Sequence, residues 1–86
     1  MLSYTQLVGE DVCYQQDVLN DTIESAVWST DQPGPVLSGV VTTSGYSLVY
    51  MSQAIPGSFV LSVQLNLTSG QVRIGQARIN VIQVGV

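Results

Sequence analysis

Residues 58–67 read SFVLSVQLNL, and every second side chain in this run is apolar. A β-strand turns successive side chains to opposite faces, so this alternation is typical of a strand with one face in the core. The run therefore predicts a long, half-buried strand at the centre of a β domain. Its core-facing side chains are Phe59, Leu61, Val63, Leu65 and Leu67.

A second alternating run follows after a short turn. Residues 68–71 read TSGQ and contain a glycine available for positive φ, as tight turns often require. From Val72 to Val81 the alternation resumes, but it slips by one residue between Ile74 and Ala77. Gly75 lies at the slip, which predicts a β-bulge or a bend between two short strands. Together the two runs predict a β-hairpin.

Shorter runs upstream of the hairpin indicate further strands. The breaker Pro33–Pro35 and the turn Ile55–Gly57 separate some of them. No helical periodicity lies between the runs, so a parallel sheet with crossover helices is not expected. Six or seven short strands with frequent turn signals predict an all-β fold, a small antiparallel β-sandwich. The predicted upstream strands are Val12–Asp17, Thr22–Thr30, Val36–Thr43 and Tyr46–Met51.

The length of the chain predicts a single domain over residues 1–86. A chain of 86 residues and 9.2 kDa is long enough for one small core and too short for two. Residues 1–10 and Gln83–Val86 lie outside the strand pattern, so we expect short arms there that become ordered on a partner. The sequence indicates neither a signal peptide nor a transmembrane segment.

The charged residues narrow the classes of function. The chain has two Lys and Arg, six Asp and Glu and no His, giving a net charge of −4. With Cys13 as the single thiol, it offers almost no ligands for zinc, haem or iron–sulfur groups, and nucleophile systems lack their histidine. Two arginines cannot form the basic stripe that nucleic acids require. A lone cysteine also fits a reducing compartment.

The scarcity of charge is itself a signal. Charged residues make up 9% of the chain, and none occurs from Gln32 to Val72, whereas about 25% is usual for a globular domain. One interpretation is a small β domain whose loops are rich in serine and glycine. The other is that this stretch lies against neighbouring subunits, because interface cores are depleted of charge.

The acidic residues do not form a recognisable catalytic or metal site. A carboxylate pair for acid–base chemistry needs one member with a raised pKa, and the sequence indicates no apolar pocket to raise it. Asp17, Asn20 and Asp21 supply oxygen ligands but lack the spacing of an EF-hand. We therefore expect solvated turn residues, with Asp21 shaping the turn before its strand. The sequence predicts no catalytic, cofactor-binding or metal-binding residues.

A few other side chains stand out. Trp28 is expected to fill the core between two sheets. Tyr46 and Tyr50 share one face of a strand, and that face is either core or interface. Cys13 is expected to be a small buried hydrophobe. Arg73 and Arg78 are available to pair with the acidic N-terminal third of the same chain or of a neighbour. The candidate partner-binding residues are Tyr46, Tyr50, Arg73 and Arg78.

The run DTIESAVWS, Asp21–Ser29, resembles a D-T-I-x-S-x-x-W-x signature of small phage proteins of immunoglobulin-like fold. These are the fibre-tail adaptor or head–tail immunoglobulin-like virion proteins. Where that family has an acidic–basic pair before its last strand, this chain has Gly75–Arg78. Further similar segments are Gly9–Tyr14, Val36–Thr43, Pro56–Leu61, Thr68–Gly70 and Ala77–Val81.

The resemblance implies an immunoglobulin-like sandwich and a role as a virion structural protein, made in the host cytoplasm. Its partners would be other virion proteins and copies of itself, without nucleic acid, membrane or cofactor. An adaptor in the neck or tail, joining tube components to fibres or ring proteins, is the first hypothesis. A capsid cement protein is the alternative, and a ligand-binding module using Trp28, Tyr46 and Tyr50 is a third. An enzyme is the weakest, since no constellation of residues supports one.

Overall fold

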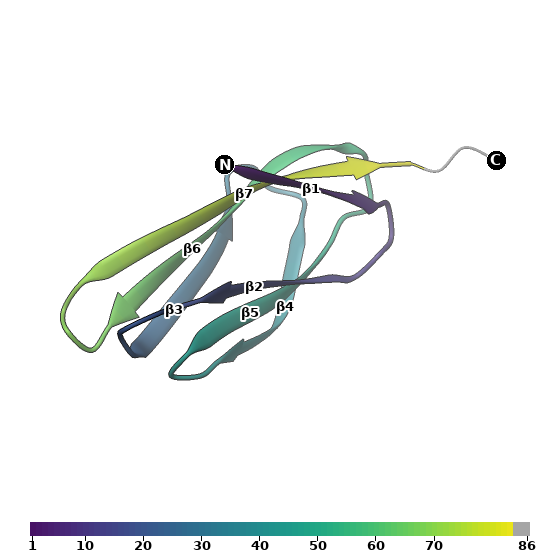
Figure 1. The fold of residues 1–86 in the computed structure, drawn as a ribbon. Coiled ribbons are helices and arrows are strands. Elements are labelled where there is room, and N and C mark those ends of the chain that lie inside the picture. Colours follow the sequence, from purple (N-terminus) through teal and green to yellow (C-terminus); the bar gives the residue numbers. More distant parts are fainter. Residues whose placement is uncertain (84–86) are drawn as a thin grey trace.

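A computed structural model describes residues 1–83, which form seven strands in two sheets packed face to face (Figure 1). The all-β architecture and the number of strands agree with the sequence prediction. Each predicted upstream strand is present to within one residue at either end. The strands are β1 (Leu2–Leu7), β2 (Val12–Asp17), β3 (Ile23–Thr30), β4 (Val36–Thr42), β5 (Tyr46–Ser52), β6 (Gly57–Leu67) and β7 (Val72–Ile82).

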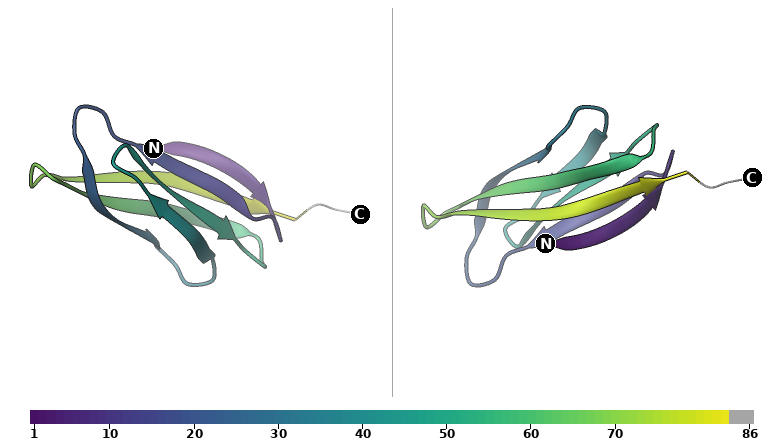
Figure 2. Two further views of the ribbon diagram at one scale, coloured as in Figure 1. Left: turned by 90° about the horizontal axis from the view of Figure 1, so that it is seen from below. Right: turned by 90° about the horizontal axis from the view of Figure 1, so that it is seen from above.

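The two sheets differ in size. The large sheet has the strand order β1-β7-β6-β3, and the small sheet has the order β2-β5-β4. Figure 2 shows the small sheet from below on the left and the large sheet from above on the right. Neighbouring strands are antiparallel except for β1 and β7, which are parallel.

The expected N-terminal arm over residues 1–10 is a strand in the structure. Residues 2–7 form β1, which pairs with β7 from Leu2 beside Ala77 to Leu7 beside Ile82. The backbone of this segment is therefore ordered by the chain's own sheet, without a partner. Of the expected C-terminal arm, Gln83 lies just beyond β7, and residues 84–86 lie outside the described residues.

The predicted hairpin of β6 and β7 is present, but the predicted bulge at Gly75 is not. The register runs without interruption from Gly57 beside Val81 to Asn66 beside Val72. The slip arises because Ile74 is an apolar residue on the outer face, where its side chain is 65% exposed. Gly75 instead makes room for the opposite sheet: a Cβ there would lie 2.6 Å from Oε1 of Gln16.

Register shifts occur in two other strands. One lies in β3 between Ile23 and Ser25, and the other lies in β4 between Ser38 and Val41. The shift in β4 contains Gly39, whose φ of 62° is in the left-handed region that favours glycine. Both irregular strands are edge strands, so each sheet has one edge with an interrupted ladder.

The core lies between the inner faces of the two sheets. Its main contributor is β6, whose five alternating apolar side chains, Phe59 to Leu67, are all buried as predicted. Val49 and Met51 of β5 face them from the small sheet and are fully buried. Trp28 is half-buried and packs against both parts of the core, so its predicted role between the sheets is confirmed.

Candidate interaction surfaces

The face shared by Tyr46 and Tyr50 is the outer face of the small sheet. On β5 the odd-numbered residues Ser47, Val49 and Met51 are buried, which turns the tyrosines outward. Tyr50 is 39% exposed and Tyr46 is half-buried. The question that the sequence left open is therefore answered: this face is surface, not core.

Uncharged side chains from β2 and β4 flank the two tyrosines. The register of the small sheet places Gln15 and Val41 beside Leu48, and Cys13 and Ser38 beside Tyr50. Val36 and Val41 are 59% and 48% exposed. Asp17, beside Tyr46 at one end, is the charged member of this face of the described sheet. We call this surface the neutral face; it comprises Cys13, Gln15, Asp17, Val36, Ser38, Val41, Tyr46, Leu48, Tyr50 and Ser52.

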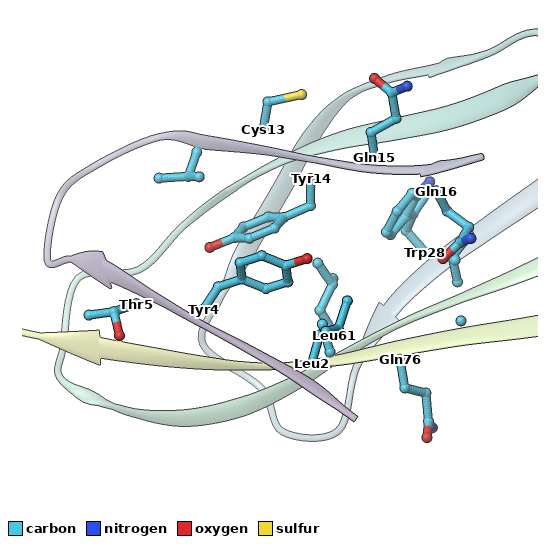
Figure 3. A pocket seen from close by; sticks show the side chains of 14 residues that line it. Leu2, Tyr4, Thr5, Cys13, Tyr14, Gln15, Gln16, Trp28, Leu61 and Gln76 are labelled. Carbon is cyan, nitrogen blue, oxygen red and sulfur yellow. The ribbon is translucent and has the colours of Figure 1, made fainter.

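Cys13 is not the buried hydrophobe that the sequence suggested. It is exposed, and Figure 3 shows its side chain pointing away from the space between the sheets. The inward positions of β2 are taken by Val12, Tyr14 and Gln16, which are all partly buried. The strand's parity therefore turns Cys13 to the neutral face.

A second surface is a groove between the sheets, lined by apolar, aromatic and amide side chains. It has a volume of about 340 Å³ and opens between β1 and β2 (Figure 3). Leu61 and Ala77 of the large sheet line it, together with the aromatic residues Tyr4, Tyr14 and Trp28. The rings of Tyr4 and Tyr14 meet edge to face with centroids 5.7 Å apart. We call this the inter-sheet groove.

The tyrosine on β2 is held by a buried hydrogen-bond chain. The hydroxyl of Tyr14 donates to Oε1 of Gln6 at 2.7 Å, and Nε2 of Gln6 donates to the carbonyl of Met51 at 3.1 Å. Gln6 is only 2% exposed. Burial, with a smaller contribution from the negative charge of Glu10 and from Tyr4, raises the pKa of Tyr14 to about 12. The neutral phenol is therefore favoured in the folded chain.

The indole of Trp28 is held in place by a hydrogen bond across the two sheets. Its Nε1 donates to Oγ of Ser47 at 2.9 Å, which ties the indole of β3 to β5 in the opposite sheet. Oγ of Ser47 is also within 3.0 Å of Oγ1 of Thr42. The indole edge that lines the groove belongs to a side chain fixed by the core.

The two arginines lie apart from the tyrosines and from each other. Arg73 is exposed near the β6–β7 turn, and its Nη1 donates to the carbonyl of Leu19 at 3.4 Å. A hydrogen bond from Ser69, a backbone N–H of Thr22 and the charge of Arg73 lower the pKa of Asp21. Arg78 is on the outer face of the large sheet beside Asp31, in a depression of about 220 Å³. The four candidate residues therefore do not form one site.

Asp21 lies in a turn as expected, whereas Asp17 and Glu24, also expected in turns, lie within β2 and β3. Oδ1 of Asp21 accepts from the backbone N–H of Thr22 at 2.7 Å, and Oδ2 accepts from Oγ of Ser69 at 2.6 Å. Asp21 thus joins the turn before β3 to the β6–β7 turn, in agreement with its predicted role. Among residues 1–83, no three His, Cys, Asp or Glu side chains form a group suited to a metal ion.

The edge of β1 is a feature that the sequence analysis missed. β1 pairs with β7 on one side and lies at the end of the large sheet. Leu2 and Tyr4 pair with Ala77 and Ile79 and therefore share their inner face. The signal was present, because Leu2-Ser3-Tyr4-Thr5 alternates in the same way as β6. The alternation is too short to stand out without the pairing to β7.

Comparisons with known proteins identify the fold. No family model and no curated protein matches the chain. A PKD domain from KIAA 1837 protein is similar over 100% of this chain and 85% of that chain, with a TM-score of 0.68 and 14% identity. An endo-fucoidan hydrolase from glycoside hydrolase family 107 is similar over 98% of this chain but only 13% of that chain, with a TM-score of 0.61 and 11% identity. The chain is thus an immunoglobulin-like β-sandwich.

No helix in the described residues is long and apolar enough to span a membrane.

Proposed function

We propose that the chain is a virion structural protein of a tailed phage, an adaptor that joins neck or tail-tube components to fibres or adjacent ring proteins. The sequence resemblance around Asp21–Ser29 suggests the setting, and the immunoglobulin-like sandwich suits a rigid spacer. The neutral face is the single observation that carries the proposal. The proposal assigns the chain no enzymatic activity and no cofactor.

The neutral face is suited to docking against another protein. Removing charged groups from water is costly, whereas hydroxyl and amide groups are cheaper to bury and can hydrogen-bond across the contact. The face combines exposed valines with tyrosines, and tyrosine is enriched at interfaces. Interface cores are also depleted of charge, as this face is apart from Asp17. Other virion proteins and further copies of the chain are the proposed partners, in particles assembled in the host cytoplasm.

The experiment compares two valine variants in phage particles. Val41→Lys adds a charge to the neutral face, and Val27→Lys adds the same charge to the outer face of β3; the two valines are 48% and 58% exposed. We expect Val41→Lys to lower the number of copies per particle at least tenfold and Val27→Lys to leave it unchanged. Equal incorporation of both variants would contradict docking through the neutral face.

The number of copies per particle tests the position in the virion. Quantitative mass spectrometry of purified particles against the major capsid protein gives this number. A ring adaptor is expected at a few to about a dozen copies, since rings follow closed rotational symmetry. Hundreds of copies per particle would contradict the adaptor proposal and favour a capsid cement protein instead. Absence from the particles would overturn the virion assignment.

A further inference from the structure

The inner face of β1 carries apolar side chains that are only partly covered. Leu2 and Tyr4 share the face of Ala77 and Ile79, and Ile79 is completely buried. Yet Leu2 is 67% exposed and Tyr4 is 45% exposed. Their orientation is that of core residues, whereas their exposure is that of surface residues. The N-terminal half of β1 thus extends beyond the part of the large sheet that the small sheet covers, whereas Gln6 in its C-terminal half is buried.

Over residues 2–5, the edge of β1 also lacks the features that usually protect an exposed strand; at Leu7, the backbone N–H donates to Oε1 of Glu10 at 2.6 Å. Edge strands avoid pairing with other chains by means of charges, prolines or bulges. β3 and β4 have register shifts, and Pro35 directly precedes β4. Asp11 directly precedes β2, and Asp17 is its last residue. In contrast, β1 is paired with β7 without a shift, and residues 1–8 contain no charged side chain and no proline.

The inter-sheet groove opens on the same side as this edge. Figure 3 shows the ring of Tyr4, on β1, and the ring of Tyr14, on β2, facing one another at the mouth of the groove. A strand added to the free edge of β1 would continue the large sheet past this mouth. Its inner side chains would lie beside Leu2 and Tyr4 and remove their apolar surface from water.

We propose that the occupant of this edge is β1 of a second copy of the chain, paired antiparallel about a two-fold axis. A two-fold contact places each surface against its own copy, so a surface with charged side chains would meet like charges. β1 itself contains no charged side chain, although the net charge of the chain is −4. The same contact at β2 would bring Asp11 of one copy toward Asp17 of the other.

The dimer joins two large sheets into one continuous sheet. An antiparallel pair satisfies the backbone groups that β1 otherwise presents to water. With the two-fold axis at Ser3, Leu2 of each copy lies beside Tyr4 of the other on the inner face, so the mouths of the two inter-sheet grooves come next to each other. This inference deepens the proposed function and rests on it only in taking the chain to act as an assembly protein. It names the edge through which copies associate and leaves both neutral faces free for other partners.

The test is the oligomeric state of the purified chain. Because an edge-to-edge contact is smaller than the ~1,600 Å² of a standard interface, sedimentation velocity should cover concentrations up to about 500 µM. We expect the natural chain to dimerise in this range. Ser3→Lys/Thr5→Lys puts two outward lysines on β1, which repel their copies across the axis, and should raise the dissociation constant at least tenfold. Val27→Lys/Ser29→Lys adds the same charges to β3 and should leave the constant unchanged.

Hydrogen exchange of the natural chain is an independent readout that needs no variant. In a lone edge strand, the alternate amides of β1 that point away from β7 exchange fast, apart from that of Leu7, which donates to Oε1 of Glu10. We expect these amides to become protected as the concentration rises through the dimerisation range. A monomer at every concentration, or a dimer that the β3 lysines dissociate as readily as the β1 lysines, would overturn the proposal. Neither result depends on the number of copies in virions. The adaptor proposal is therefore tested separately, by that number.

Discussion

At the scale of single residues, Gly75 and Gly39 both lie within strands but for different reasons. Gly75 is in an uninterrupted ladder, and a Cβ there would meet the flexible end of Gln16 at 2.6 Å and Cγ1 of Val63 at 3.3 Å. Gly39 has a φ of 62°, and a Cβ there would lie 3.0 Å from Cδ2 of Tyr50. At Gly75 a side chain is disfavoured because it would crowd the flexible end of Gln16. At Gly39 a side chain is disfavoured because the backbone is in the left-handed conformation.

Alanine substitution separates these two cases. Gly75→Ala should change the free energy of unfolding by less than about 1 kcal/mol, because Gln16 can swing aside and alanine lowers the entropy of the unfolded chain. Gly39→Ala should cost about 1–2 kcal/mol, the strain of a left-handed residue with a side chain. Urea unfolding followed by Trp28 fluorescence measures both. A larger loss at Gly75 than at Gly39 would mean that Gln16 and Val63 cannot move to make room for the added Cβ.

The hydroxyl of Tyr14 is expected to contribute to stability through Gln6. Tyr14→Phe removes the 2.7 Å hydrogen bond to Oε1 of Gln6, which is almost completely buried. A buried acceptor left without a donor costs about 1–3 kcal/mol, and we expect a loss of this size in urea unfolding at pH 7. Tyr50→Phe removes an exposed hydroxyl from the neutral face and serves as the control. Equal losses in the two variants would contradict the role of the Gln6 contact.

The same tyrosine should make stability depend on pH in alkaline solution. Its pKa in the folded chain is raised from 10.0 to about 12, so the folded chain holds the phenolic proton more tightly than the unfolded chain. This contribution is complete below pH 10 and is lost as the pH rises toward 12. The free energy of unfolding, measured from pH 9 to 12, should therefore fall less steeply in Tyr14→Phe than in the natural chain. Parallel curves would contradict the raised pKa.

At the scale of elements, β6 and β7 pair along their length but contribute differently to the core. Leu61 on β6 is 3% exposed, whereas Ile74 on β7 is 65% exposed. Leu61→Ala should cost about 2–5 kcal/mol, because it leaves a cavity in the core. Ile74→Ala should change stability by less than about 0.5 kcal/mol, as is usual for surface positions. Thermal and urea unfolding of the two variants test this. A loss at Ile74 comparable to that at Leu61 would place the outer face of β7 in a packed environment.

These elements also show what could be predicted from the sequence. The burial of Phe59 to Leu67 followed from their alternation, because a period of two places all five apolar side chains on one face of the strand. β1 was missed because its partner, β7, lies about seventy residues further along the chain, and only that pairing gives Leu2 and Tyr4 an inner face. The slip at Gly75 was misread because an exposed apolar residue, Ile74, looks the same in a sequence as a core residue.

The candidate surfaces were predictable to a similar extent. The shared face of Tyr46 and Tyr50 followed from their spacing, but its exposure depended on which parity of β5 meets the large sheet. Cys13 was misplaced for the same reason, since β2 is too short for its pattern to distinguish the two faces. The separation of Arg73 from Arg78 depended on the uninterrupted pairing of β6 with β7, since a bulge between them was expected. Such non-local pairings are not encoded in the pattern of any single segment.

At the scale of the whole molecule, the low content of charged residues predicts that solubility depends strongly on pH. The isoelectric point is about 4.1, and 9% of residues are charged. Near that pH the net charge vanishes and repulsion between copies is weakest, so light scattering should reach its maximum there. Val27→Lys/Ser29→Lys adds two positive charges and should move the maximum to higher pH. A maximum that stays in place would show that net charge does not control association.

The parallel pairing of β1 with β7 determines how the molecule bears tension. A pull on Met1 and an opposite pull at Ile82 act along two neighbouring strands in opposite directions, since the strands run side by side (Figure 1). The evenly spaced backbone hydrogen bonds of the parallel pair are then loaded in shear and must break together rather than one after another. A domain connected in this way resists stretching along its chain direction, and a thread of such domains would transmit force without lengthening.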